Sequence, residues 1–258
     1  TPSHHTRVEL MTTWTRHLYE HDYLAIAKGE SNGYSAVHKF GANFDLDAGT
    51  VPETIWTNGG LYPWSALDNS EVIYVKSDDN DDTSQLEIIG LDEDWNEASE
   101  TVVMSGTTPV ATTSTFRRVY RMIYNHTGEN EGVITAHAGS SGGTVVANID
   151  EGVSQTLMCV YTVPAGYTAY LVSLGFAVQK NKDAQVRFYS RGSKDESFKI
   201  KHIAEVYEAQ YNYMFAVPLK FLEKSDLDLR SADVESNNTR VTANFDLILI
   251  KDTIQGEP

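Results

Sequence analysis

The sequence predicts an all-β protein: two β-sandwich or jelly-roll-like units preceded by a short N-terminal arm. From Glu71 onward, short runs rich in β-branched and aromatic residues alternate with turns of Gly, Pro, Asn, Asp and Ser. No alternating β and α order accompanies them, which argues against a parallel sheet. No exact internal repeat is visible, which argues against a solenoid or propeller.

Residues 1–22 are predicted to be the arm, either a short helix or an extended segment, and Trp14 within it is expected to contact a neighbouring subunit. Residues 23–28 are predicted to form a short strand that ends at Gly29. Residues 41–64 are too rich in Gly, Pro, Asn and Asp for regular structure, yet too aromatic for a disordered linker. We expect an ordered loop that crosses a sheet or a subunit boundary, where Trp56, Tyr62 and Trp64 make intersubunit contacts. Alanine at Trp56 or Trp64 should then weaken assembly and leave the fold intact.

The first unit is assigned to residues 23–150, with strands expected at 72–75, 85–89, 100–104 and 115–123 and a hairpin from 132–136 to 144–149. The second unit is assigned to residues 151–258. It opens with two strand-like runs, 157–163 and 168–172, joined by a turn that contains Pro164 and Gly166. Further strands are expected at 169–179, 185–190, 198–206, 211–217, 226–229 and 239–250. A single continuous sandwich remains the alternative.

The composition limits the classes of function. The 258 residues hold 36 acidic against 20 basic side chains, a net charge of −16 that repels a phosphate backbone and argues against nucleic-acid binding. The sequence contains no run of about twenty apolar residues, so no membrane-spanning helix is predicted. The single cysteine, Cys159, lies in an apolar run and is expected to be a buried thiol. Basic residues such as Lys199 and Lys201 are either solvated charges or docking patches for an acidic surface.

Two short motifs resemble functional sites, one a catalytic nucleophile and the other a pair of metal ligands, but each has a simpler structural explanation. Residues 139–143 match G-x-S-x-G beside His137, but the following residues are strand-like, whereas a nucleophile elbow needs a strand-to-helix turn. A hairpin turn explains the Gly and Ser residues. His17 and His21 have the i, i+4 spacing of metal ligands on a helix, with no further ligand motif apparent.

A cluster of carboxylates is the candidate metal site. Asp78, Asp79, Asp81 and Asp82 are candidate calcium ligands, although the glycine and glutamate of an EF-hand loop are absent. A solvated hairpin tip is the favoured interpretation, so no cofactor is expected apart from this calcium alternative. Paired carboxylates for glycoside hydrolysis depend on spatial separation, which leaves a β-sandwich hydrolase as a third hypothesis.

Several segments together resemble a family of structural proteins of tailed-phage virions, of the marine and cyanobacterial phage type. The resemblance covers about residues 23–252 and rests on residues 25–33, 40–47, 55–63, 90–103, 106–110, 155–171, 218–221, 224–227 and 244–249. It implies an all-β particle component without catalysis, and we expect this component on the outer surface of the virion.

From this resemblance we expect a capsid decoration or cement protein. It would act as a homo-oligomer, most simply a trimer, that bridges subunits of the major capsid protein, and it would be neither an enzyme nor a nucleic-acid or membrane binder. The alternative is a tail, baseplate or fibre component that contacts a receptor or glycan through exposed aromatic residues.

Overall fold

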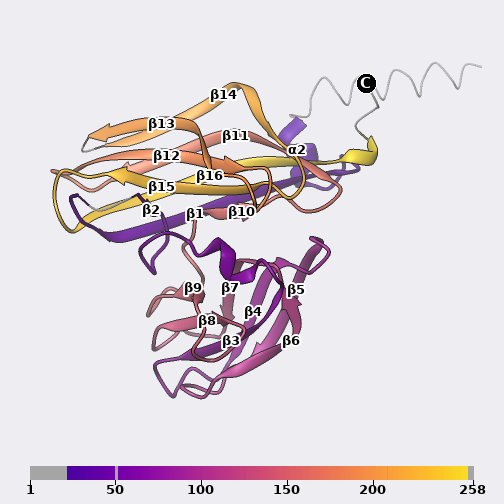
Figure 1. Ribbon diagram of the computed structural model, residues 1–258, viewed down its shortest axis with the longest axis vertical. Helices are drawn as coiled ribbons and strands as arrows, with labels where there is room; N and C mark the ends of the chain where they lie inside the picture. The colour runs from indigo at the N-terminus through magenta and orange to yellow at the C-terminus, as the bar shows by residue number, and fades with distance from the viewer. Residues whose placement is uncertain (1–21, 50–51, 208, 255–258) are drawn as a thin grey trace, which may run out of the picture.

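The computed structural model describes residues 22–49, 52–207 and 209–254, and this part of the chain is nearly all antiparallel β structure, as predicted (Figure 1). One short helix, α2 (Asp22–Ala27), replaces the strand expected at 23–28. Leu24, Ala25 and Ala27 favour this helix. Gly29 ends it with a φ of 70° and donates its N–H to the Ile26 carbonyl.

Eight strands form the larger unit, a two-layered sandwich. They are β1 (Tyr34–Leu46), β10 (Val160–Thr162), β11 (Tyr167–Val178), β12 (Asp183–Arg191), β13 (Lys199–Tyr207), β14 (Gln210–Phe221), β15 (Asp226–Asp233) and β16 (Thr239–Lys251). One sheet has the order β1-β16-β11-β14 and the other β10-β15-β12-β13, with the short β2 (Glu53–Thr54) paired to β15. Numbered along the chain, these orders are 1-8-3-6 and 2-7-4-5, the arrangement of an eight-stranded jelly roll.

The side-chain pattern of β16 shows why the sheets pack face to face. Its odd-numbered residues from Thr239 to Leu249 are buried, and its even-numbered residues point to the opposite, more accessible face. Phe245 in the core contacts Phe188 of the facing sheet, with ring centroids 5.4 Å apart.

The smaller unit is inserted between β2 and β10, so a jelly roll that begins with β1 is interrupted and then completed. It contains the 3-10 helix η1 (Trp64–Leu67) at its entry and strands β3 (Glu71–Ser77), β4 (Gln85–Leu91), β5 (Glu97–Val103), β6 (Val110–Phe116), β7 (Arg118–Asn125), β8 (Ile134–Ala138) and β9 (Val145–Ile149). These strands form a sheet of order β6-β3-β8-β9 and a sheet of order β5-β4-β7. Figure 1 shows this unit beside β1 and β10, while β13 and β14 lie on the far side of the jelly roll.

The sheets divide the chain differently from the predicted split at residue 150. β1 lies in the C-terminal sheet because Tyr34 pairs with Ile250 and Val37 with Leu247. Residues 41–46, expected in a loop, continue β1, and the run expected at 115–123 is two strands separated at Arg117. The hairpin between β8 and β9 forms as predicted.

The predicted arm, residues 1–22, lies outside the described residues except for Asp22, which begins α2. In the described part of the chain, no helix has both the length and the apolar character needed to cross a bilayer.

Candidate functional site

The aromatic residues predicted at an intersubunit contact are inside this chain, at the junction of its two units. Trp56, Tyr62 and Trp64 are 1%, 4% and 7% exposed. Their rings form a chain of edge-to-face contacts with centroids 5.3 Å and 4.7 Å apart. The Tyr62 hydroxyl donates to the Val119 carbonyl of β7 over 2.9 Å. These side chains therefore fix the inserted unit to the jelly roll and present no exposed surface, which corrects the sequence-based interpretation. Trp14 lies outside the described residues.

Buried ion pairs complete this junction. Arg118 of β7 donates from Nε and Nη2 to the two carboxylate oxygens of Asp226 in β15, over 3.0 and 3.1 Å. Arg191 donates its Nε–H to the same carboxylate over 2.8 Å. Asp228, two residues along β15, accepts from the Trp64 indole and the Thr54 hydroxyl, both over 3.0 Å. Burial raises the pKa of Asp228, and these donors act against that rise.

The acidic turn predicted as a calcium candidate uses its oxygens to hold backbone. Asp82 is buried and accepts from Ser77 and from the backbone N–H groups of Glu131 and Gly132. Asp78 accepts from the Val133 N–H. Asp79 accepts from the N–H of Asp81. Within the described ranges, no three His, Cys, Asp or Glu side chains converge as metal ligands would.

The nucleophile-like residues are in a turn, as the simpler interpretation held. Residues 139–143 connect β8 to β9, and His137 bonds the Gly143 carbonyl and the Thr135 hydroxyl. Cys159 is buried, and burial raises the pKa of its thiol well above the ordinary value. His17 and His21 are not among the described residues.

A group of exposed apolar side chains on two edge strands was missed by the sequence reasoning. We call it the β13–β14 edge and define it by exposed Ile200, Ile203, Tyr207, Tyr213, Met214 and Val217. β13 and β14 each end their sheet, with no further strand beyond them in the described chain. Residues 215–218 of β14 stand opposite the single residue Val172 of β11, so this part of β14 bulges out of the sheet. Val217 on the bulge is 79% exposed. The run from Tyr211 to Val217 was correctly predicted to be a strand. Polar and apolar residues do not strictly alternate along it, and this was the available signal that both faces of the strand are apolar.

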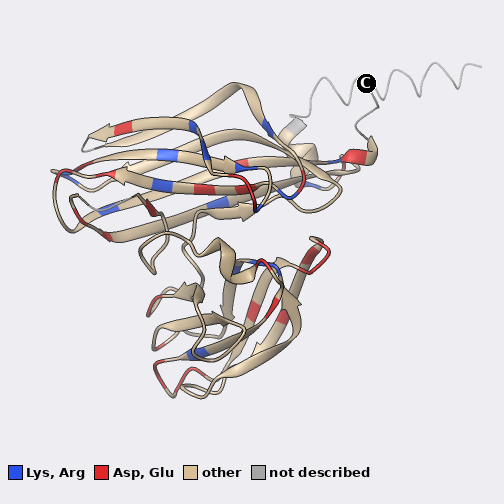
Figure 2. Cartoon of the chain, in the orientation of Figure 1, with Lys and Arg blue, Asp and Glu red and all other residues tan. Residues whose placement is uncertain are grey.

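Charge divides between the two units. Residues 71–154 contain 15 acidic and 4 basic side chains, a net charge of −11, whereas residues 155–258 contain 13 and 12. Figure 2 shows acidic residues on the turns of the inserted unit. β13 and β14 together carry three lysines, Lys199, Lys201 and Lys220, and one acidic residue, Glu205. The apolar β13–β14 edge is thus basic within an acidic chain.

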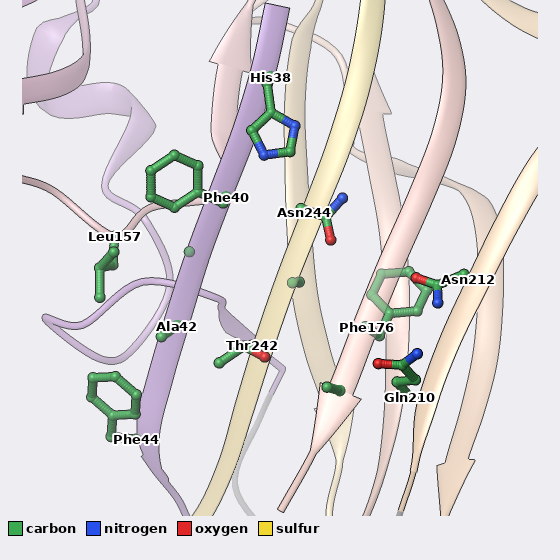
Figure 3. A pocket seen from close by; sticks show the side chains of 13 residues that line it. His38, Phe40, Ala42, Phe44, Leu157, Phe176, Gln210, Asn212, Thr242 and Asn244 are labelled. Carbon is green, nitrogen blue, oxygen red and sulfur yellow. The ribbon is translucent and has the colours of Figure 1, made fainter.

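A shallow groove crosses the outer face of the β1-β16-β11-β14 sheet, with a volume of about 510 Å³ (Figure 3). The strand register arranges its residues in rows. One row is Phe40, Asn244, Gly175 and Asn212, and the next is Ala42, Thr242, Ala177 and Gln210. Gly175 and Ala177 of β11 form the floor, and the amide and hydroxyl groups of the neighbouring strands β16 and β14 line the two sides.

The neighbouring row contains His38, Asp246 and Ser173, the residue types of a hydrolytic triad. Their connectivity differs from a triad, because His38 and Ser173 both bond the Asp246 carboxylate. A serine nucleophile needs its base in contact with its own hydroxyl. This row therefore forms a polar cluster on the sheet surface.

Comparison with known proteins adds distant structural likenesses. No family model and no curated protein matches the sequence. Among solved structures, the PBSX exported protein XepA matches with 12% identity and a TM-score of 0.19, over 83% of this chain and 84% of its own. The infectious bursal disease virus Gx strain structure matches with 9% identity and a TM-score of 0.24, over 84% and 72%. These values are too low to transfer a function.

Proposed function

We propose that this protein is a structural component of a tailed-phage virion and that it decorates the capsid. The observation that carries the proposal is the β13–β14 edge, an apolar and basic surface on the side of the jelly roll away from the acidic inserted unit. Jelly rolls are frequent among viral capsid domains, although lectins and cupins share them. The segments that resemble virion proteins support the same class.

The edge is suited to docking through side chains. Groups of exposed apolar side chains on a monomer mark interaction sites, and the two edge strands carry six such side chains. The bulge at residues 215–218 and Pro218, which has no N–H, oppose the addition of another strand to β14. Side chains such as Met214 and Val217 would instead pack on the partner.

The partner in this proposal is the major capsid protein, contacted by a homotrimer at the outer surface of the head. The acidic inserted unit would face solvent, where like charges keep particles apart. The protein would act by burying surface between capsid subunits, with no cofactor and no catalysis.

The test is the number of copies of the chain per purified particle, measured by quantitative mass spectrometry against the major capsid protein. Decoration predicts a copy number on the order of hundreds, because icosahedral symmetry multiplies each surface site. A count of about six to a few dozen would place the protein on the tail or neck, and its absence from particles would refute a structural role.

Matched variants test the surface. Val217→Lys on the β13–β14 edge should lower the copy number at least tenfold. Val103→Lys, on β5 of the inserted unit and 63% exposed, should leave the copy number unchanged. Equal copy numbers for both variants would refute docking through this edge.

A further inference from the structure

The groove on the β1-β16-β11-β14 sheet has polar groups that no other part of the described chain uses. The side chains of Asn212 and Asn244 have no hydrogen-bond partner among the described residues, and neither do those of Gln210 and Thr242. They come from β14 and β16, on either side of β11 (Figure 3). The register of three strands therefore places unused donors and acceptors around one point.

That point is Gly175, in the interior of β11. A Cβ at this residue would lie 2.3 Å from Oδ1 of Asn244 and 3.1 Å from Oδ1 of Asn212, so both amides lean over the glycine. Glycine inside a strand weakens it and often marks the close approach of a ligand. Ala177 continues the floor along β11 into the row that contains Thr242 and Gln210.

The wall along β1 is aromatic. Phe40 and Phe44 line the groove on the side opposite Gln210 and Asn212, and Phe44 is 41% exposed. An exposed phenylalanine ring offers an apolar face next to the amides. The groove thus pairs flat apolar surface with neutral hydrogen-bonding groups.

The chemistry of the lining narrows the ligand class. His38 is the one ionisable side chain among the lining residues, and its Nδ1 is 2.5 Å from the Asp246 carboxylate. Arg121 and Arg240 lie outside the lining, 5.6 and 5.9 Å from the ring centroids of Phe40 and Phe44, so the floor and the amide side of the groove offer only neutral groups to a ligand. A wholly apolar ligand would leave the amides desolvated and unpaired. A neutral ring compound with many hydroxyl groups fits both features, with hydroxyls on the amides and C–H faces on the rings.

We propose that this groove binds an uncharged carbohydrate. Asn212 of the groove is two residues from Met214 of the β13–β14 edge, but Ala177 and Asn244 lie on β11 and β16. The groove can therefore be altered without changing the edge, and it adds a ligand to a particle-bound protein. A single open groove of this kind should bind a monosaccharide weakly, with a Kd on the order of 1 mM. Many copies on a particle would strengthen attachment to a glycan-coated surface by avidity.

The experiment is an array of neutral and acidic glycans probed with the full chain, followed by titration of the strongest neutral oligosaccharide. Asn244→Ala and Asn212→Ala should each raise the Kd at least fivefold. Ala177→Glu, which keeps every amide but fills the floor, should abolish binding. Gln85→Ala removes an exposed amide from β4 of the inserted unit and should leave the Kd unchanged.

Circular dichroism melts of each variant separate loss of binding from loss of fold. Binding only to acidic glycans, or to no compound on the array, would overturn the proposal. So would a neutral-sugar Kd that is the same in the folded groove variants and the wild type, because the sugar would then bind elsewhere. Copy number per particle should be unchanged in Asn244→Ala and Ala177→Glu, which leave β14 intact, so failure here leaves the proposed decoration role testable by itself.

Discussion

Replacing Lys39 by methionine should stabilise the protein at neutral and acidic pH. Lys39 lies on β1 at the junction, is only 3% exposed, and donates its ammonium to the Tyr120 carbonyl of β7. Burial lowers its pKa from 10.5 to about 7, and the positive charge of Arg121 contributes to the decrease. Methionine has a similar length and no charge to bury.

The magnitude follows from proton linkage. The decrease of the Lys39 pKa from 10.5 to about 7 lowers the free energy of unfolding at acidic pH by about 5 kcal/mol, since each pKa unit corresponds to about 1.4 kcal/mol. Between these two pH values the unfolded chain holds a proton that the folded chain has lost, so wild-type stability rises with pH across this window. Below pH 7 the folded protein bears the full cost of burying the charged ammonium of Lys39, and above pH 10.5 this cost is absent.

Methionine also removes the hydrogen bond to the Tyr120 carbonyl, at a cost of about 1–3 kcal/mol. The net gain expected at pH 6 is therefore about 2–4 kcal/mol, falling to zero near pH 9 and becoming a small loss at pH 10. The assay is urea unfolding at several pH values, followed by the fluorescence of the buried junction residues Trp56 and Trp64.

Lys194→Met, at an exposed position, is the control and should change stability by less than about 0.5 kcal/mol at every pH. A Lys39→Met protein that is less stable than the wild type at pH 6, or whose difference from it does not vary with pH, would refute the reasoning.

Two further substitutions test the junction. Trp64→Ala should lower the free energy of unfolding by about 3–5 kcal/mol, because it removes a buried ring and the donor to Asp228; a change under 1 kcal/mol in urea titration would contradict this packing. Asp226→Asn should cost a similar amount, about 3–5 kcal/mol, because it leaves Arg118 and Arg191 buried without their shared carboxylate. Calorimetry should then show the two units melting separately in Asp226→Asn, whereas a single unshifted transition would show that the ion pairs do not couple them.

Local pattern predicted most strands because it is a property of neighbouring residues. The alternation in residues 239–250 and the turn around Gly166 are both visible in the printed order. The helix at 22–27 was wrongly assigned as a strand, since six residues are too few to show a period. The buried state of Cys159 was predicted correctly from its apolar neighbours.

Strand partners far apart in the chain could not be predicted in this way. β1 pairs with β16, so residues such as Tyr34 and Ile250 are neighbours in the sheet although the inserted unit and the rest of the jelly roll lie between them in the sequence. The same fact hid the groove, whose lining comes from β1, β11, β14 and β16. Aromatic residues gave the opposite error: Trp56 and Trp64 looked like an interface, and they are one, but between two units of the same chain.

The insertion separates most of the acidic charge of the chain from the β13–β14 edge. A net charge of −16 spread evenly would repel an acidic partner from every side. Most of that charge resides in residues 71–154, which the buried pair of Arg118 with Asp226 fixes to the jelly roll. β13 and β14 lie on the side of the jelly roll away from these acidic turns. At physiological salt, charges more than about one Debye length apart are largely screened from each other. The hydrogen-bonded ion pairs at the junction hold the acidic unit on the side away from the edge. Under the proposed docking on an acidic partner, loosening the junction by Asp226→Asn should lower the copy number per particle even though the β13–β14 edge itself is unchanged.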